Sequence, residues 1–333
     1  MRRSVLLVLL LVVLLLGGLF AWLQRGAEVP AQAERQLLLP ALSGHLGEVR
    51  KLSIRHGELP AVRIERTEAG WVVPAKAGYP AAAGEVNRLL RALAEARKVE
   101  AKTRNPDNHA RLGLAAKGEG RATRLRIDGI GSAPLVLLIG QGSRQGGQLV
   151  RLAGDDQVWL IDQPLELVDN ELAWLDRRIS AIPFASVREV EVRHADGERL
   201  NVWRDSPGQA DLALRQLPVG RSLAYQPLAN GMALLFAALD FADAAPLAQV
   251  GFKDRPELEF TLSTFDGGEL RGAFHLQGAQ HWLVLGESEG LDDQLIAGRD
   301  WAYRLEEQQY RMLARRLKDL LGPANPGRAR PGE

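Results

Sequence analysis

The sequence predicts an α+β fold, in which an N-terminal transmembrane helix precedes two tandem duplicated units, each a mostly antiparallel sheet with one amphipathic helix. Three patterns indicate it: an uncharged apolar run near the start of the chain, strand-like alternation that recurs at a fixed spacing, and one helical apolar stripe in each half. The 333 residues suffice for about two domains. We expect five segments: N-terminus and anchor (1–23), tether (24–36), first unit (37–180), second unit with a closing C-terminal helix (181–321) and disordered tail (322–333).

The membrane segment is the run of nineteen uncharged residues from Val5 to Leu23. At about 1.5 Å per residue, a helix of this length reaches about 28 Å and just spans a bilayer core. Arg2 and Arg3 precede the run, whereas acids soon offset the lone Arg25 that follows it, so the N-terminus is expected in the cytoplasm. We therefore expect a single-pass inner-membrane protein whose bulk is periplasmic or otherwise extracytoplasmic.

A cleaved signal peptide is the alternative, with an apolar region from Val5 to Leu16. Its plausible cleavage site, Ala31-Gln32-Ala33, lies about ten residues beyond the apolar run, farther than such sites usually lie. We therefore favour an uncleaved anchor. Both interpretations export the rest of the chain.

Two hairpins are expected at a spacing of 138 residues. In each, apolar residues alternate with charged ones and a glycine-containing turn joins two strands. The shift aligns Leu52 with Val190, Ile54 with Val192, His56 with His194, Ile64 with Val202 and Arg66 with Arg204.

Each unit is also expected to contain one helix and a meander. A shift of 146 aligns the stripe Val86, Leu89, Leu90, Leu93 with Met232, Leu235, Phe236, Leu239, which is the i, i+3, i+4, i+7 spacing of an amphipathic helix. Alternation then resumes near Leu125 and Phe260, which predicts an antiparallel meander in each unit. The segments around Trp174 and Trp301 are predicted to occupy equivalent places, the latter leading into a helix that ends at Leu321.

Charge and composition exclude several classes of function. Lys and Arg total 42 against 41 Asp and Glu, so the net charge of +1 gives no case for nucleic-acid binding. The absence of cysteine excludes thiol catalysis, cysteine-bound zinc and disulfides.

The chemical motifs are weak, and no catalytic, cofactor-binding or metal-binding residue is predicted. Gly286–Gly290 fits the G-x-S-x-G pattern of a hydrolase nucleophile elbow, but no histidine follows Ser288, so a polar turn after a strand is the favoured interpretation. His275 and His281 flank a turn and could approach each other, although a metal would need a third ligand. Gly140–Gly147 lacks the end of a phosphate loop and is expected to be a hairpin loop.

Two further sets of residues are expected to be structural. The acid pairs Asp155-Asp156 and Asp292-Asp293 are flanked by glycine, which favours turns. Four tryptophans on predicted strands are assigned to the core or a sheet face, with a sugar-binding platform as the alternative: Trp71, Trp159, Trp203 and Trp282.

Several spaced motifs together resemble the family of domain of unknown function 4340. They are Tyr79-Pro80, the helix with Leu89-Leu90, Asn105-Pro106, Leu112-Gly113-Leu114, Trp174–Arg178, Leu239–Phe241, Thr264–Gly267 and Trp301–Leu305. The resemblance implies a bacterial, membrane-anchored, envelope-facing protein of a family often found beside ABC-type transport components similar to those of gliding-motility systems. It implies no catalytic residue.

We therefore expect a non-enzymatic scaffold or binding subunit of an ABC-type membrane complex, without a cofactor. Two alternatives stay open. One is a ligand-binding module for glycans or lipids; the other is an enzyme such as a hydrolase, whose His, Asp and Ser would meet only in the folded chain.

Overall fold

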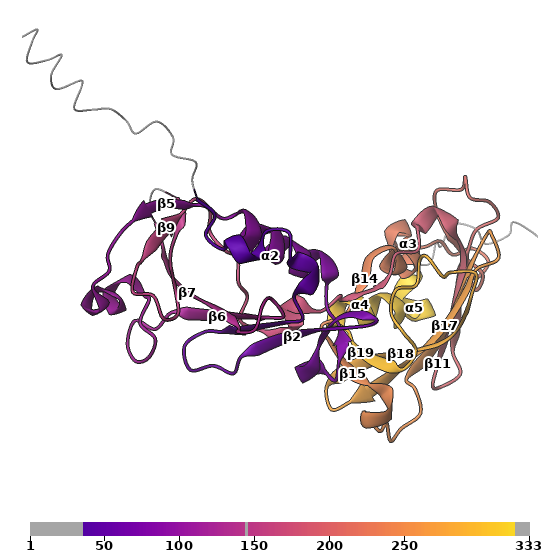
Figure 1. The fold of residues 1–333 in the computed structure, drawn as a ribbon. Coiled ribbons are helices and arrows are strands. Elements are labelled where there is room, and N and C mark those ends of the chain that lie inside the picture. The colour runs from indigo at the N-terminus through magenta and orange to yellow at the C-terminus, as the bar shows by residue number, and fades with distance from the viewer. Residues whose placement is uncertain (1–35, 144–145, 324–333) are drawn as a thin grey trace, which may run out of the picture. The chain divides into compact units, whose positions relative to one another are not determined.

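The computed structural model describes residues 36–143 and 146–323 (Figure 1). The predicted anchor from Val5 to Leu23, nearly all of the tether and most of the tail lie outside these residues. Among the described helices, none combines the length and apolar character needed to cross a membrane.

The fold consists mostly of antiparallel sheet with few helices, as the sequence predicts. The first sheet has nine strands in the order β4-β3-β2-β1-β6-β7-β8-β9-β5. Their bounds are β1 (Lys51–Arg55), β2 (Val62–Thr67), β3 (Gly70–Val73), β4 (Tyr79–Pro80), β5 (Lys98–Ala101), β6 (Thr123–Asp128), β7 (Leu135–Gly142), β8 (Gln148–Leu152) and β9 (Trp159–Ile161).

The second sheet has eight strands in the order β13-β12-β11-β16-β17-β18-β19-β15. Their bounds are β11 (Val187–His194), β12 (Arg199–Trp203), β13 (Ala213–Leu214), β15 (Asp243–Pro246), β16 (Leu258–Thr264), β17 (Glu269–Gln277), β18 (Gln280–Glu289) and β19 (Trp301–Arg304). A separate pair is formed by β10 (Arg178–Ser180) and β14 (Leu239–Asp240).

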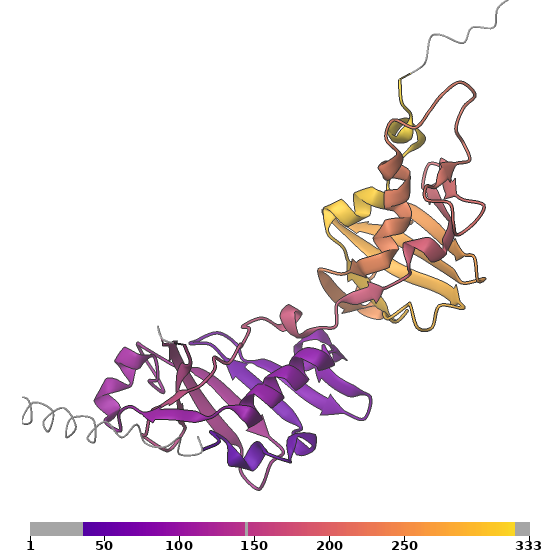
Figure 2. The same ribbon diagram turned by 90° about the horizontal axis from the view of Figure 1, so that it is seen from above.

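The α-helices are α2 (Ala83–Glu95), α3 (Gln226–Leu234), α4 (Glu307–Leu313) and α5 (Leu317–Leu320). Short 3₁₀ turns are η1 (Pro40–Leu42), η2 (Leu46–Glu48), η3 (Pro74–Lys76), η4 (Pro106–Asn108), η5 (Ala110–Leu112), η6 (Glu171–Trp174), η7 (Phe184–Ser186), η8 (Leu235–Ala238) and η9 (Leu247–Gln249). Each sheet carries one long helix across a face, α2 on the first and α3 on the second (Figures 1 and 2).

The two sheets share one strand order. The first sheet has one extra strand, β4, at its edge. Its other eight strands lie in the same order as the eight strands of the second sheet, so that β1 corresponds to β11 and β9 to β19. The leading hairpins also share a register, since the pairs Leu52–Ile64 and Ile54–Val62 become Val190–Val202 and Val192–Leu200 when 138 is added to each number. The architecture is therefore repeat-like.

The predicted helical stripes are buried. In α2, Val86 and Leu93 are fully buried, as are Met232 and Phe236 in the second stripe. The second helix is shorter than predicted, because the α-helix ends at Leu234, continues as the turn η8 and gives way to β14 at Leu239. A row of aromatic rings fills the space between helices and second sheet, with centroid distances of 5.2 Å for Phe236–Phe260, 6.2 Å for Phe260–Phe274 and 5.5 Å for Phe274–Tyr310.

The prediction for the C-terminal segment is wrong in two respects. Trp301 lies in β19, which occupies the same place as β9, whereas Trp174 ends the turn η6 outside both sheets, so the two segments are not equivalent. The single helix to Leu321 is instead two short helices, because Arg315 and Arg316 between α4 and α5 bond with the β11–β12 hairpin.

Contacts divide the chain into two compact units. Among the described residues, one comprises 36–48, Leu89–Leu125 and Ile130–Glu166, and the other Val49–Arg88, Arg126–Gly129 and 167–323. The expected segments 37–180 and 181–321 stay predictions.

Candidate functional site

The serine of the G-x-S-x-G motif lies in a strand. β18 extends to Glu289, and Ser288 pairs with Leu270 of β17 next to a register shift. A nucleophile elbow needs a sharp turn from strand to helix, so the local structure differs both from that motif and from the expected polar turn.

His275 and His281 lie on opposite faces of the second sheet. His275 pairs with Trp282, and His281 pairs with Leu276, so each histidine shares its face with a different cross-strand partner. His275 stacks on Phe252, with ring centroids 4.3 Å apart, and His281 stacks on Tyr310 at 3.5 Å. The two rings, which the sequence allowed to approach each other, therefore point away from each other across the sheet. Within the described residues, no three His, Asp or Glu side chains gather as a metal site would require.

His281 is the centre of a titratable cluster at the end of β18. Its Nδ1 lies 3.2 Å from Glu257 Oε2 and its Nε2 lies 3.0 Å from Glu307 Oε2. Tyr310 donates from its hydroxyl to the same Glu257 oxygen over 3.0 Å. Both ring nitrogens can donate only when the imidazole is protonated. The imidazole ring therefore joins α4 to β18 and to the loop before β16.

The tyrosine in this cluster is held in its neutral form. Burial, the hydrogen bond to Glu257 and the negative charges of Glu257 and Glu307 raise the pKa of Tyr310. The hydroxyl is thus a hydrogen-bond donor over the whole physiological pH range. Its contact with Glu257 helps to fix α4 against the second sheet.

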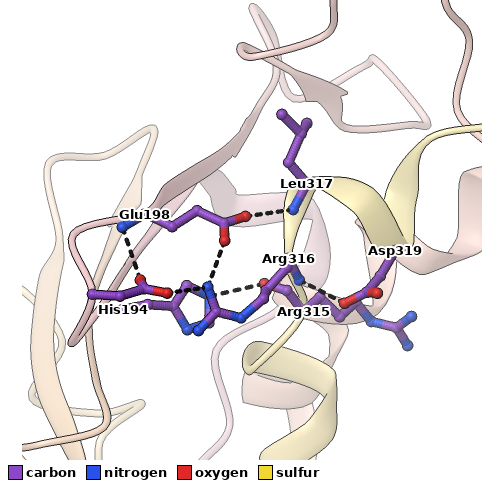
Figure 3. Close-up of polar contacts among 7 residues, drawn as sticks. His194, Glu198, Arg315, Arg316, Leu317 and Asp319 are labelled. Atoms are coloured by element: carbon purple, nitrogen blue, oxygen red, sulfur yellow. Dashed lines mark hydrogen bonds and ion pairs between the residues drawn. The ribbon is translucent and has the colours of Figure 1, made fainter.

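A second polar cluster, which we call the C-terminal clamp, joins the tip of the β11–β12 hairpin to the chain between α4 and α5 (Figure 3). His194 Nε2 lies 3.0 Å from the carbonyl oxygen of Arg315. Glu198 accepts from the Leu317 amide over 2.8 Å and from the Arg316 guanidinium, which also donates to Asp196 over 2.7 Å.

The electrostatics of the clamp favour its charged state. The amide of Glu198 and the guanidinium of Arg316 hold the pKa of Asp196 below its usual range. The amide of Leu317, followed by Arg316, lowers the pKa of Glu198. Figure 3 shows the Glu198 carboxylate between Arg316 and Leu317, so one acid binds both a charge and the start of α5.

An aromatic cluster surrounds Tyr79 of β4. Its ring meets those of Trp301, Phe241 and Tyr303 edge-on, with centroids 4.7, 5.2 and 6.4 Å apart. Burial raises the pKa of Tyr79 to about 12. Nearby, Lys76 forms an ion pair with Asp243 at 2.8 Å. These contacts lie within one of the two compact units and hold β4 against β19 and against the chain that follows β14.

A polar cavity of about 370 Å³ lies where β17 begins and β18 ends, beside Arg299. Its lining residues are Glu269, Arg271, Glu287, Ser288, Glu289 and Arg299. Arg271 is bonded to Glu269 and Glu287 at 2.7 and 3.3 Å. The cavity wall thus combines carboxylates, guanidinium groups and one hydroxyl, a set suited to a polar ligand. Sequence reasoning singled out the Gly286–Gly290 motif, whereas Glu269, Arg271 and Arg299 come beside it only in the folded chain.

The tryptophans expected on strands do not form a platform in this cavity. Trp71 and Trp282 are buried, with 7% and 8% of their surface exposed. Trp159 and Trp203 are half-buried beneath Lys98 and Arg215, whose charged atoms lie 4.8 and 4.2 Å from the ring centroids. Asp292 and Asp293 lie in a turn as predicted, whereas Asp155 and Asp156 directly follow the turn at residues 153–154. Asp155 accepts from the Gln157 amide over 3.0 Å.

The loop prediction for Gly140–Gly147 is corrected in part. Gly140 and Gly142 belong to β7, so the connection to β8 is shorter than expected.

His109, which is 4% exposed, places Nε2 3.0 Å from the Asp156 carbonyl oxygen and packs the 105–114 segment against the turn after β8.

Residues 71–230 match the family model described as Domain of unknown function (DUF4340). The chain is a DUF4340 domain-containing protein. The match begins in β3 and ends inside α3, so this DUF4340 segment takes strands from both sheets but completes neither. Comparisons with curated proteins and with solved structures gave no match.

Proposed function

We propose that this DUF4340 protein is a membrane-anchored, extracytoplasmic scaffold or binding subunit without enzymatic activity, associated with an ABC-type membrane complex similar to those of gliding-motility systems. The observation that carries the proposal is the shared strand order of the two sheets. We infer that they arose by tandem duplication. A duplicated framework doubles the surface available to partners, which favours binding over a single catalytic centre.

The environment of the histidines supports a non-enzymatic role. His109 and His194 are buried and contact backbone carbonyl oxygens, and His281 is held between two glutamates. A general base must instead reach a substrate proton. The run from Val5 to Leu23 supports an anchor in a bacterial inner membrane, and the arginines before it support a cytoplasmic N-terminus.

Partner recovery tests the proposal. The tagged full-length chain is purified in mild detergent from its native membranes, and the proteins that accompany it are identified by mass spectrometry. We expect an ABC-type permease and ATPase with the intact chain and their loss when residues 5–23 are deleted. Recovery of the chain alone, or equal recovery with the deletion variant, would contradict the proposal.

The cavity favours a second candidate, a ligand-binding module. Its charged and hydroxyl lining fits the hydroxyl groups of a glycan better than the acyl chain of a lipid. Oligosaccharides should raise the melting temperature of the full-length protein, and Arg299→Ala should remove that shift. The matched control is Arg255→Ala, an exposed arginine outside the cavity lining. A shift that survives Arg299→Ala would exclude this cavity as the site.

A further inference from the structure

The segment between η9 and β16 covers part of the second sheet but is held by few contacts. Within the part of the chain that the structure describes, no residue from 251 to 256 forms a hydrogen bond or an ion pair. The nearest backbone bonds run from the Val250 amide to the Leu247 carbonyl oxygen, at 3.2 Å, and from the Glu257 amide to that of Phe274, at 2.8 Å. The 251–256 segment can therefore move without breaking a polar contact.

One aromatic ring attaches this segment to the sheet. The Phe252 ring stacks on His275 of β17, with centroids 4.3 Å apart and ring planes inclined by 16°. It also packs against a buried cluster that contains Trp282 of β18. In contrast, residues 253–255 are exposed. The 251–256 segment is thus a lid whose attachment depends on one side chain.

Two polar atoms in the surroundings of the Phe252 ring have no partner among the described residues. His275 and Trp282 are cross-strand neighbours on one face of the second sheet. Trp282 is 8% exposed, and its Nε1 is buried without a hydrogen-bond partner, as is Nδ1 of His275. Burying a polar group without a new bond is costly, and a hydrocarbon ring offers none. Phe252 therefore fills this place without satisfying the groups around it.

A tyrosine side chain matches this place better than phenylalanine does. Its ring has the same shape, and its hydroxyl can both donate and accept a hydrogen bond. The indole of Trp282 only donates, whereas Nδ1 of His275 donates or accepts according to its tautomer. One hydroxyl can therefore serve either atom, which favours a phenol ring over the hydrocarbon ring of Phe252.

We propose that the 251–256 lid is self-inhibitory, because Phe252 occupies a binding site for a tyrosine side chain of a partner chain. The partner's ring displaces Phe252, stacks on His275 and brings its hydroxyl to the polar atoms of His275 and Trp282. This inference rests on the proposed role as a binding subunit and names the chemistry of the partner. It requires neither the membrane anchor nor the cavity beside Arg299.

The test uses the full-length chain labelled with fluorinated tryptophan and followed by fluorine NMR. The chain contains seven tryptophans, and Trp282→Phe identifies the signal of Trp282. The probes are N-acetyltyrosinamide, N-acetylphenylalaninamide, which lacks the hydroxyl, and N-acetylleucinamide, which lacks the ring. Trp203 of β12, whose ring is covered by Arg215, is the internal control and is identified by Trp203→Phe.

We expect the tyrosine probe to shift the signal of Trp282 but not that of Trp203. It should bind about fivefold more tightly than the phenylalanine probe, the effect of one additional hydrogen bond. Phe252→Ala should strengthen its binding about tenfold, because the competing ring is removed. The matched control is Phe265→Ala, a half-buried phenylalanine in the turn between β16 and β17, which should leave the affinity unchanged.

Equal affinities for the tyrosine and phenylalanine probes would overturn the proposal, as would a Trp282 signal that no probe moves. So would an unchanged affinity in Phe252→Ala, with circular dichroism as the check that this variant is folded. Phe252→Leu, which removes the aromatic ring but keeps an apolar side chain, repeats the measurement if Phe252→Ala does not fold. The probes stand in for the partner, so this proposal and the one tested by partner recovery can each fail alone.

Discussion

Gly118 and Gly120 both adopt the left-handed backbone region, with φ of +77° and +65°, but their surroundings differ. A Cβ on Gly120 would lie 2.0 Å from the Ala110 carbonyl oxygen, whereas a Cβ on Gly118 would meet no atom within 4 Å. Gly118→Ala should cost about 1 kcal/mol, the penalty of the left-handed conformation alone. Gly120→Ala should lower the free energy of unfolding by clearly more, because the backbone at Ala110 would have to move away from the new Cβ. Urea unfolding of both variants measures the difference, and equal costs would contradict the clash.

Arg204 illustrates how one residue type takes different roles in the two hairpins. It is 2% exposed, lies 4.5 Å from the Phe184 ring centroid and donates to the carbonyl oxygens of Phe184, Val187 and Gln209. Burial lowers its pKa. Its counterpart Arg66 is exposed.

We expect Arg204→Met to destabilise the protein by about 3 kcal/mol, because buried carbonyl groups lose their donors. Arg66→Met is the matched control and should cost less than about 1 kcal/mol. Thermal or urea unfolding of the two variants tests this comparison. Similar losses of stability in the two variants would show that the burial of Arg204 does not explain its contribution to the fold.

At the scale of elements, the C-terminal clamp should make the protein sensitive to acid. The folded pKa values of Asp196 and Glu198 are lowered, so these carboxylates stabilise the protein above their unfolded values of about 4, and this contribution is lost as pH falls through the folded values. Glu198→Gln should therefore lower the melting temperature at neutral pH but have progressively less effect toward pH 3.

The control for the clamp is Glu100→Gln, in an exposed ion pair with Lys102. Its effect should be close to zero at every pH, because exposed pairs contribute little. A Glu198→Gln effect that does not change with pH would show that packing, rather than charge, holds the hairpin to the start of α5.

At the scale of the whole molecule, the family match does not coincide with a folding unit. Residues 71–230 lack β1 and β2 of the first sheet and β16–β19 of the second. We expect this fragment to lack cooperative unfolding, while a chain of residues 36–323 retains it. Circular dichroism during heating distinguishes the two, and a sharp transition in the short fragment would contradict the expectation.

Alternation and helical stripes were sufficient to predict the antiparallel hairpins and the buried faces of α2 and α3, since these depend on neighbours in sequence. Register and long-range contacts were not predictable in this way. A shift of one residue separates His275 from the face of His281. Trp301–Arg304 forms the strand β19 because it pairs with β15 on one side and β18 on the other. The charged residues around Ser288 come together only where β17 and β18 pair.

The C-terminal clamp can form only some time after its hairpin has been synthesised. His194 and the Arg315 carbonyl it contacts are 121 positions apart. A hairpin forms within about 10 μs, but at about 5–20 residues per second the ribosome needs roughly ten seconds to reach Arg315. Throughout that interval the acidic tip of the hairpin lacks its arginine. Closure of the second unit at this point therefore waits for residues 315–317.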